Sequence, residues 1–167
     1  MKGKTVVCVK LNKGEINPFD GAALESALCL GFDETTVLTM SPPSSIPVAE
    51  SITRLGVKVI VLCDSAFAGS DTVATSYILS KAISRLNPDF IFCGRQSTDG
   101  DTAQVPPMIA ERLGFSSVAG VMEFSESGVK TRAGKSYSFE KKTVYTFERI
   151  KNLRFPSMFS EKGEVTV

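Results

Sequence analysis

Five short apolar runs alternate with segments of helical periodicity over residues 1–124, and this alternation constrains the fold more than any other feature of the chain. The runs are Thr5–Val9, Thr36–Met40, Val57–Cys63, Asp89–Cys93 and Val118–Phe124. Between them, apolar residues recur at the spacing of one helix face. Expected N-cap residues precede these segments at Asn17, Ser45, Asp71 and Asp101. Strands that alternate with helices predict a parallel sheet with right-handed crossovers.

The expected architecture is therefore α/β: a doubly wound, Rossmann-like parallel sheet with strand order 3-2-1-4-5. After Ser125 the apolar pattern changes to a period of two, which indicates a small antiparallel meander. The alternating residues are Tyr137, Phe139, Thr143, Tyr145 and Phe147. An apolar tail follows at Leu153–Phe159. With 167 residues and no repeats, the chain is predicted to be a single domain, with a parallel core over 1–124 and the meander and tail over 125–167.

The composition excludes several classes of function. The 19 basic and 18 acidic residues leave a formal net charge of +1, which favours neither nucleic acid nor an anionic membrane as a partner. The absence of histidine excludes Ser-His and Cys-His nucleophile pairs and the common zinc sites, and we predict no catalytic or metal-ligating residues. The apolar run near Met1 is too short for a signal peptide, and no stretch is long enough to span a bilayer. A cytoplasmic location is therefore expected.

The cysteines favour a reducing compartment. They stand at positions 8, 29, 63 and 93, and no two of them form a CxxC motif. Cys8, Cys63 and Cys93 end apolar runs, so they are interpreted as small buried hydrophobic residues without a disulfide or a metal. A second interpretation is compatible with the first, in which these strand ends line one crevice.

The stretch Gly94–Leu113 is the candidate functional segment. It leads from the fourth apolar run through a glycine-containing loop into a segment with helical spacing. A helix start leaves backbone N–H groups without partners and carries partial positive charge, so it can hold a phosphate. The alternative is an ordinary strand-to-helix turn capped by Asp101.

The expected strand order favours the first of these interpretations. In a doubly wound sheet, ligands bind beyond the carboxyl ends of the strands where the strand order reverses. With the order 3-2-1-4-5, that point lies between the first and fourth strands. The loops Cys8–Asn12 and Gly94–Gln104 would then face each other across a crevice, which suits a nucleotide.

Several motifs resemble the electron transfer flavoprotein beta subunit family. They occur in order over most of the chain, and the matching segments are Cys8–Lys10, Asn17–Asp20 with Ala23 and Leu24, Phe67–Thr72, the block Cys93–Val105, and Arg154–Ser157. The resemblance implies an adenine-nucleotide-binding α/β domain. It also implies a heterodimer with an alpha subunit that makes most of the contacts to a redox FAD. The beta subunit itself would hold AMP or a second FAD, and a homodimer is the alternative assembly of the isolated chain.

The resemblance also implies the residues of the cofactor site. The nucleotide would contact Cys8, Asn17 and Met40 near the strand ends. Gly94 would open the phosphate loop, and the phosphate would meet Asp101, Thr102, Ala103, Gln104 and Val105.

Three features depart from the family pattern. Lys10–Asn17 is predicted to be a short polar loop, in which the link Leu11–Ile16 replaces a longer hairpin-like insertion. This short link is expected to shorten the adenine pocket. The chain ends at Val167, where relatives continue into an arm around the alpha subunit. Pro106 stands where relatives commonly have glycine, and it removes one N–H from the helix start.

Three hypotheses follow. The chain is a redox subunit that works with an alpha-type flavoprotein, or a binding module that holds an adenine nucleotide without electron transfer. The third hypothesis is an enzyme on the same fold, for which no residue suggests a catalytic role.

Overall fold

The computed structural model of the protein describes residues 2–12, 15–41, 43–62, 72–95, 105–151, 153 and 165–166. Nine strands of these residues form one sheet. They are β1 (Lys4–Cys8), β4 (Glu34–Met40), β5 (Lys58–Leu62), β6 (Phe90–Gly94), β7 (Ser116–Ser125), β8 (Gly128–Thr131), β9 (Ser136–Ser138), β10 (Thr143–Phe147) and β11 (Val165–Thr166). Their order is β11-β5-β4-β1-β6-β10-β7-β8-β9, and pairing is parallel from β11 to β7 and antiparallel beyond it.

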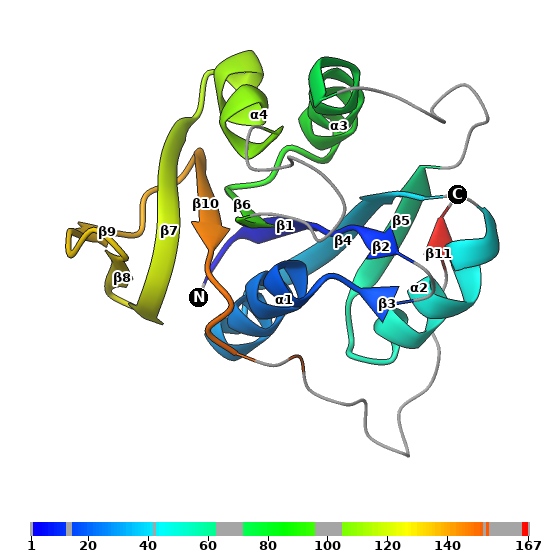
Figure 1. Ribbon diagram of the computed structural model, residues 1–167, viewed down its shortest axis with the longest axis horizontal. Coiled ribbons are helices and arrows are strands. Elements are labelled where there is room, and N and C mark those ends of the chain that lie inside the picture. Colours follow the sequence, from blue (N-terminus) through cyan, green and yellow to red (C-terminus); the bar gives the residue numbers. More distant parts are fainter. Residues whose placement is uncertain are drawn as a thin grey trace.

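Four α-helices of the described residues cover this sheet on both faces. Helices α1 (Pro18–Leu30) and α2 (Ile46–Thr53) lie on one face, and α3 (Thr72–Leu86) and α4 (Val105–Leu113) lie on the other (Figure 1). A short 3-10 helix, η1 (Pro43–Ser45), leads into α2. None of the helices in the described ranges is long and apolar enough to cross a membrane.

The core is divided between the two faces of the sheet because the central strands are buried on both sides. Side chains of one strand point alternately to opposite faces. On β6, Phe92 packs on the side of α1, whereas Ile91 packs on the side of α3 and α4. Continuous apolar strands of this kind are typical of parallel sheets covered by helices on both faces.

The fold class predicted from the sequence is confirmed, but one position in the strand order differs. The first four predicted strands lie in the order 3-2-1-4, as β5-β4-β1-β6. The next position is occupied by β10, which was predicted to belong to the antiparallel meander. Strand β10 is parallel to both of its neighbours, and β7, the predicted fifth strand, lies beyond it.

The sequence of β10, TVYTF, explains this insertion. Tyr145 and Phe147 suit one face of the sheet, and Val144 is equally apolar on the other. The Thr146 hydroxyl accepts a hydrogen bond from the Gly120 N–H at 2.9 Å, which satisfies its polar group in the interior. A segment apolar on both faces is more stable in the middle of a sheet than at its edge. Among the strands that the structure describes, β8 and β9 form the antiparallel extension of the sheet, next to β7.

Two local predictions also need correction. The segment Lys10–Asn17 was predicted to be a polar loop, but β2 (Leu11–Asn12) and β3 (Glu15–Ile16) pair as a small antiparallel hairpin, in which Leu11 is buried. Ser45 precedes α2, as predicted, but its side chain makes no capping hydrogen bond. Its backbone is already helical, because η1 runs directly into α2.

The position of β10 predicts a contrast between two aromatic residues from the expected meander. Phe147 is 0% exposed and Tyr137 on β9 is 42% exposed. In urea unfolding, Phe147→Ala is expected to lower the free energy of unfolding by about 3–5 kcal/mol. Tyr137→Ala should change it by no more than about 0.5 kcal/mol. Equal, small losses for both variants would show that β10 is not a central strand.

Candidate functional site

The strand order reverses between β1 and β6, as the sequence predicted. From β1 the chain crosses to β4 through α1 on one face, and it returns to β6 through α3 on the other. The two strands are parallel, with Cys8 aligned to Cys93, so their carboxyl ends meet at one edge of the sheet. This is the point of a doubly wound sheet at which a ligand crevice forms.

The Asp20 carboxylate joins the two strands just beyond these ends. Its Oδ2 accepts a hydrogen bond from the Lys10 backbone N–H at 2.7 Å, and its Oδ1 accepts one from the Gly94 N–H at 3.1 Å. Asp20 lies in the first turn of α1 and is 8% exposed. One side chain therefore fixes β1, β6 and the start of α1 relative to one another.

Burial of Asp20 raises its pKa from the ordinary value of 3.8 to about 7. The hydrogen bonds from Lys10 and Gly94 and the positive charge of Lys10 act in the opposite direction, but they do not overcome the cost of desolvating the anion. The folded protein therefore holds a proton on Asp20 at pH values at which the unfolded chain has released it.

Gly94 is required at the end of β6 by the close approach of α1. A Cβ atom at this position would lie 2.6 Å from the Asp20 nitrogen and 2.7 Å from the Phe19 carbonyl carbon, and it would also clash with the Asp20 carboxylate. These distances are shorter than any relaxed contact, and two of the atoms belong to the backbone of α1. The glycine predicted to open the phosphate loop thus has a packing role.

Asn17 presents a buried donor beside this junction. Its Oδ1 caps α1 by accepting a hydrogen bond from the Phe19 N–H at 2.9 Å, as the sequence predicted. Its Nδ2 is buried and has no hydrogen-bond partner among the described residues. A buried donor without a partner costs about 1–3 kcal/mol. The Asn17 amide is therefore suited to an acceptor atom supplied by a ligand.

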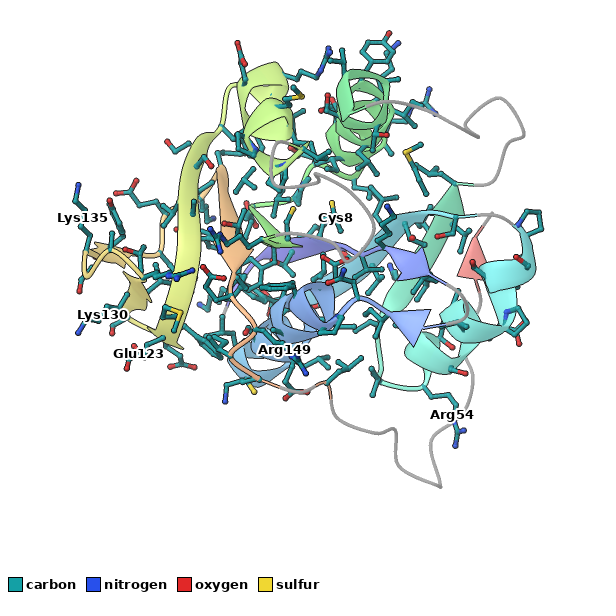
Figure 2. All side chains as sticks on the ribbon, in the orientation of Figure 1. Cys8, Arg54, Glu123, Lys130, Lys135 and Arg149 are labelled. Atoms are coloured by element: carbon teal, nitrogen blue, oxygen red, sulfur yellow. The ribbon has the colours of Figure 1, made fainter. Side chains whose placement is uncertain are left out.

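An apolar wall lies on the face of the sheet that α3 and α4 cover, opposite to the face covered by α1. Cys8, Met40 and Val105 pack in the same cluster as the buried Cys93. The neighbouring Cys8 thiol, and then burial, raise the pKa of the Cys93 thiol, so it stays neutral. Figure 2 shows Cys8 among the central strands, whereas Glu123, Lys130 and Lys135 lie at the outer strands β7–β9.

Cys8 and Cys93 are free thiols, and the Cys29 thiol donates a hydrogen bond to Glu25 Oε2 at 3.2 Å. Cys63 lies outside the described residues. Within the described ranges, no three acidic, cysteine or histidine side chains come together as metal ligands.

Of the predicted site residues, the structure brings together two groups. Cys8, Met40 and Val105 form the apolar wall, and Asn17 and Gly94 adjoin the Asp20 carboxylate. The residues Asp101, Thr102, Ala103 and Gln104 lie outside the described part of the chain. Sequence reasoning missed the role of Asp20, although its place in the first turn of α1 beside the cap Asn17 was a usable signal.

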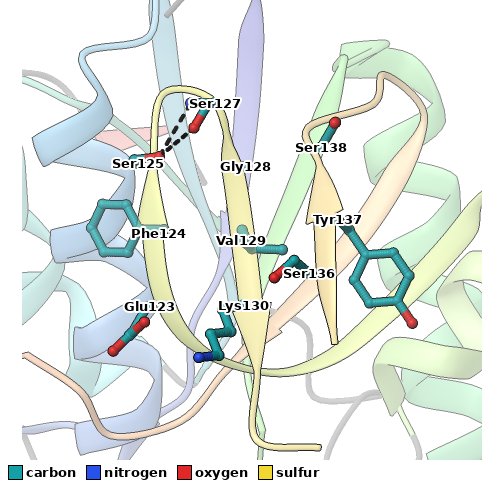
Figure 3. A pocket seen from close by; sticks show the side chains of 10 residues that line it. All are labelled: Glu123, Phe124, Ser125, Ser127, Gly128, Val129, Lys130, Ser136, Tyr137 and Ser138. Carbon is teal, nitrogen blue, oxygen red and sulfur yellow. Dashed lines mark hydrogen bonds between the residues drawn. The ribbon is translucent and has the colours of Figure 1, made fainter. Parts of the chain in front are cut away.

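A hollow on the outer strands contains none of the predicted site residues. It lies over β7, β8 and β9, and Figure 3 shows Lys130 and Tyr137 among its lining side chains. At its rim the Ser125 and Ser127 hydroxyls form a hydrogen bond of 2.7 Å. Its lining residues lie on β7, β8 and β9 and on the turn between β7 and β8, and not at the junction of β1 and β6.

Comparisons with known proteins show the family of this chain. Residues 5–160 match the model of the electron transfer flavoprotein domain. The chain belongs to the electron transfer flavoprotein family. The resemblance seen in the sequence is thereby confirmed.

Proteins named electron transfer flavoprotein subunit beta are among the relatives of this chain. The chain is 38% identical to an electron transfer flavoprotein subunit beta of Clostridium acetobutylicum, over 87% of this chain and 60% of the relative. It is 41% identical to a Protein FixA of Azorhizobium caulinodans, over 77% of this chain and 48% of the relative. It is 48% identical to an acryloyl-CoA reductase electron transfer subunit gamma of Anaerotignum propionicum, over 68% of this chain and 45% of the relative. The matched part therefore spans about half the length of these relatives.

The raised pKa of Asp20 predicts how stability depends on pH. Between about pH 4 and pH 7 the folded state binds a proton that the unfolded state has released, so this contribution to stability is lost as the pH rises. Asp20→Asn cannot titrate. The difference in free energy of unfolding, wild type minus Asp20→Asn, is therefore expected to fall by up to about 1.4 kcal/mol per pH unit in this range and to level off above it.

Urea unfolding at several pH values measures this difference. Asp33→Asn is the control, because it removes an exposed carboxylate that accepts one backbone hydrogen bond, from Gly3. It controls for the loss of one carboxylate without loss of the bridge between β1 and β6. A wild type that gains stability relative to Asp20→Asn as the pH rises would mean that Asp20 is ionised in the fold.

Proposed function

We propose that this chain is the beta-type part of an electron transfer flavoprotein. It binds an adenine nucleotide, AMP or the AMP half of FAD, at the junction of β1 and β6, and it supports electron transfer together with an alpha-type subunit. In this function it acts as a single nucleotide-binding domain in the cytoplasm.

The observation that carries this proposal is the unpartnered Nδ2 of Asn17. The donor is buried next to the carboxyl ends of β1 and β6, where a doubly wound sheet binds its ligand. An adenine nitrogen or a ribose oxygen is an acceptor of suitable size and polarity. The apolar wall of Cys8, Met40 and Val105 suits the face of a purine.

The phosphate is proposed to bind near the start of α4, with Thr102 as a hydroxyl donor from the family motif. Pro106 and Pro107 occupy the first turn of this helix, and proline has no backbone N–H. The helix start therefore offers fewer donors than usual. Part of the negative charge has to be met by residues before Pro106 or by side chains elsewhere.

A stand-alone nucleotide-binding module without redox activity is the second candidate. The feature that favours it is the small hairpin of β2 and β3, whose strands have two residues each. A short wall supports the AMP half of a ligand better than a long dinucleotide.

Nucleotide binding is tested by calorimetry with AMP, ADP, ATP and FAD. Asn17→Ser keeps a good N-cap residue but removes the amide donor, so the affinity for AMP is expected to fall by about 1 kcal/mol with little loss of thermal stability. Thr102→Ala is expected to cost a similar amount. No heat and no thermal shift with any of the four ligands would refute the proposal, and mass spectrometry of the small molecule released on denaturation identifies the natural ligand.

The two candidate functions, an electron-transfer subunit and a stand-alone nucleotide-binding module, predict different binding of FAD. The chain alone is expected to retain no tightly bound, redox-active FAD, because in the resembled family the alpha subunit contributes most of the pocket for the isoalloxazine ring. The visible spectrum after soaking in FAD and desalting tests this, alone and after co-expression with an alpha-type subunit. A flavin band near stoichiometric amount in the isolated chain would contradict it, and no flavin in either sample would favour the stand-alone module.

A further inference from the structure

Two arginines converge on one buried carboxylate at the end of β10. Glu148 follows β10, and its side chain is 9% exposed. Its Oε1 lies 3.3 Å from Nη1 of Arg95, which follows β6, and 3.7 Å from Nη1 of Arg132, which follows β8. Three elements distant in sequence therefore contribute to one charged cluster, Arg95–Glu148–Arg132.

A bulge in β7 brings this cluster together. The register between β10 and β7 shifts after Tyr145, and Gly120 at the shift has a left-handed φ of +75°. The Gly120 carbonyl accepts a hydrogen bond from the Arg132 N–H at 2.8 Å, and the neighbouring Val121 carbonyl accepts one from the Glu148 N–H at 3.0 Å. The bulge thus sets the backbones of Arg132 and Glu148 side by side.

The charges of the cluster do not cancel. Two guanidinium cations share one carboxylate, which leaves an excess of one positive charge. Each guanidinium has five N–H donors, and Oε1 makes no hydrogen bond of good geometry with any described residue. The side chains of Arg95 and Arg132 are 43% and 68% exposed. Their remaining donors are therefore available to an anion from solvent.

We infer that Arg95 and Arg132 form a phosphate subsite that extends the nucleotide site and takes the second phosphate of its ligand. This inference rests on the proposed function. Arg95 directly follows Gly94, so the cluster begins where the proposed crevice ends. Pro106 and Pro107 deprive the start of α4 of two N–H donors, and guanidinium groups are well matched to phosphate oxygens. Glu148 is the positioning residue that gathers the two cations.

The test compares the affinities for AMP, ADP and inorganic pyrophosphate in wild type, Arg132→Gln and Arg149→Gln. Arg149 is the matched control, because it is exposed and adjacent to Glu148 and undergoes the same change of charge. The wild type should bind ADP about tenfold more tightly than AMP. Arg132→Gln should remove most of this preference and leave the affinity for AMP within about twofold. Arg149→Gln should keep the preference.

The outcomes separate this subsite from the proposed function. The subsite is overturned if the wild type binds AMP with no preference for ADP. It is also overturned if Arg132→Gln lowers the affinities for AMP and ADP equally. Both outcomes leave the nucleotide site in place. If no nucleotide binds, the proposed function fails. The binding of pyrophosphate then decides whether the subsite of Arg95 and Arg132 exists. Pyrophosphate binding that Arg132→Gln weakens supports the subsite as a site for free phosphates, and absence of pyrophosphate binding overturns it.

Discussion

The Asp20 carboxyl group, held between the backbones of β1 and β6, is the interaction on which the candidate site depends. It connects the two strands at which the topology reverses, and it does so from the first turn of α1. The cost of burying it is offset in part by two backbone N–H donors and by its protonation below about pH 7. The same close approach demands glycine at position 94. The candidate site and the packing constraint on Gly94 thus involve the same atoms.

Three buried polar groups near this edge are satisfied to different degrees. Asp20 receives a donor on each oxygen, which suits a structural role. Asn17 uses its oxygen to cap α1 and leaves its nitrogen without a partner in the described part of the chain. The carboxylate of Glu148 is shared by the guanidinium groups of Arg95 and Arg132, so its one negative charge neutralises only one of the two positive charges. The unsatisfied groups define what the proposed ligand would have to supply, a neutral acceptor near α1 and an anion near β10.

Much of this architecture was predictable from the chain alone, for a local reason. Apolar periodicity and capping residues are encoded within a few neighbours, so the strands around Val7 and Phe92 and the cap at Asn17 were predicted correctly. The insertion of β10 between β6 and β7 was not predicted, because neighbour order depends on which distant segments satisfy both faces. Val144 is apolar and lies on the face of the sheet opposite to Tyr145 and Phe147. A meander strand with one face in solvent would have a polar residue there, so Val144 was a signal for a central position. The Asp20 bridge and the Arg95–Glu148–Arg132 cluster likewise join residues far apart in sequence, so a local pattern can suggest Asp20 but cannot identify the partners of any of these side chains.

The central claim is that an adenine nucleotide binds at the carboxyl ends of the central strands, and photoaffinity labelling tests this proposal directly. An azido-adenosine monophosphate is irradiated with the protein, with and without excess AMP, and the labelled peptides are mapped by mass spectrometry. Label that AMP displaces, placed at the carboxyl ends of β1 and β4 near Cys8 and Met40, is the predicted result. Displaceable label confined to the outer strands around Lys130 and Tyr137, or label that AMP does not displace, would contradict the account.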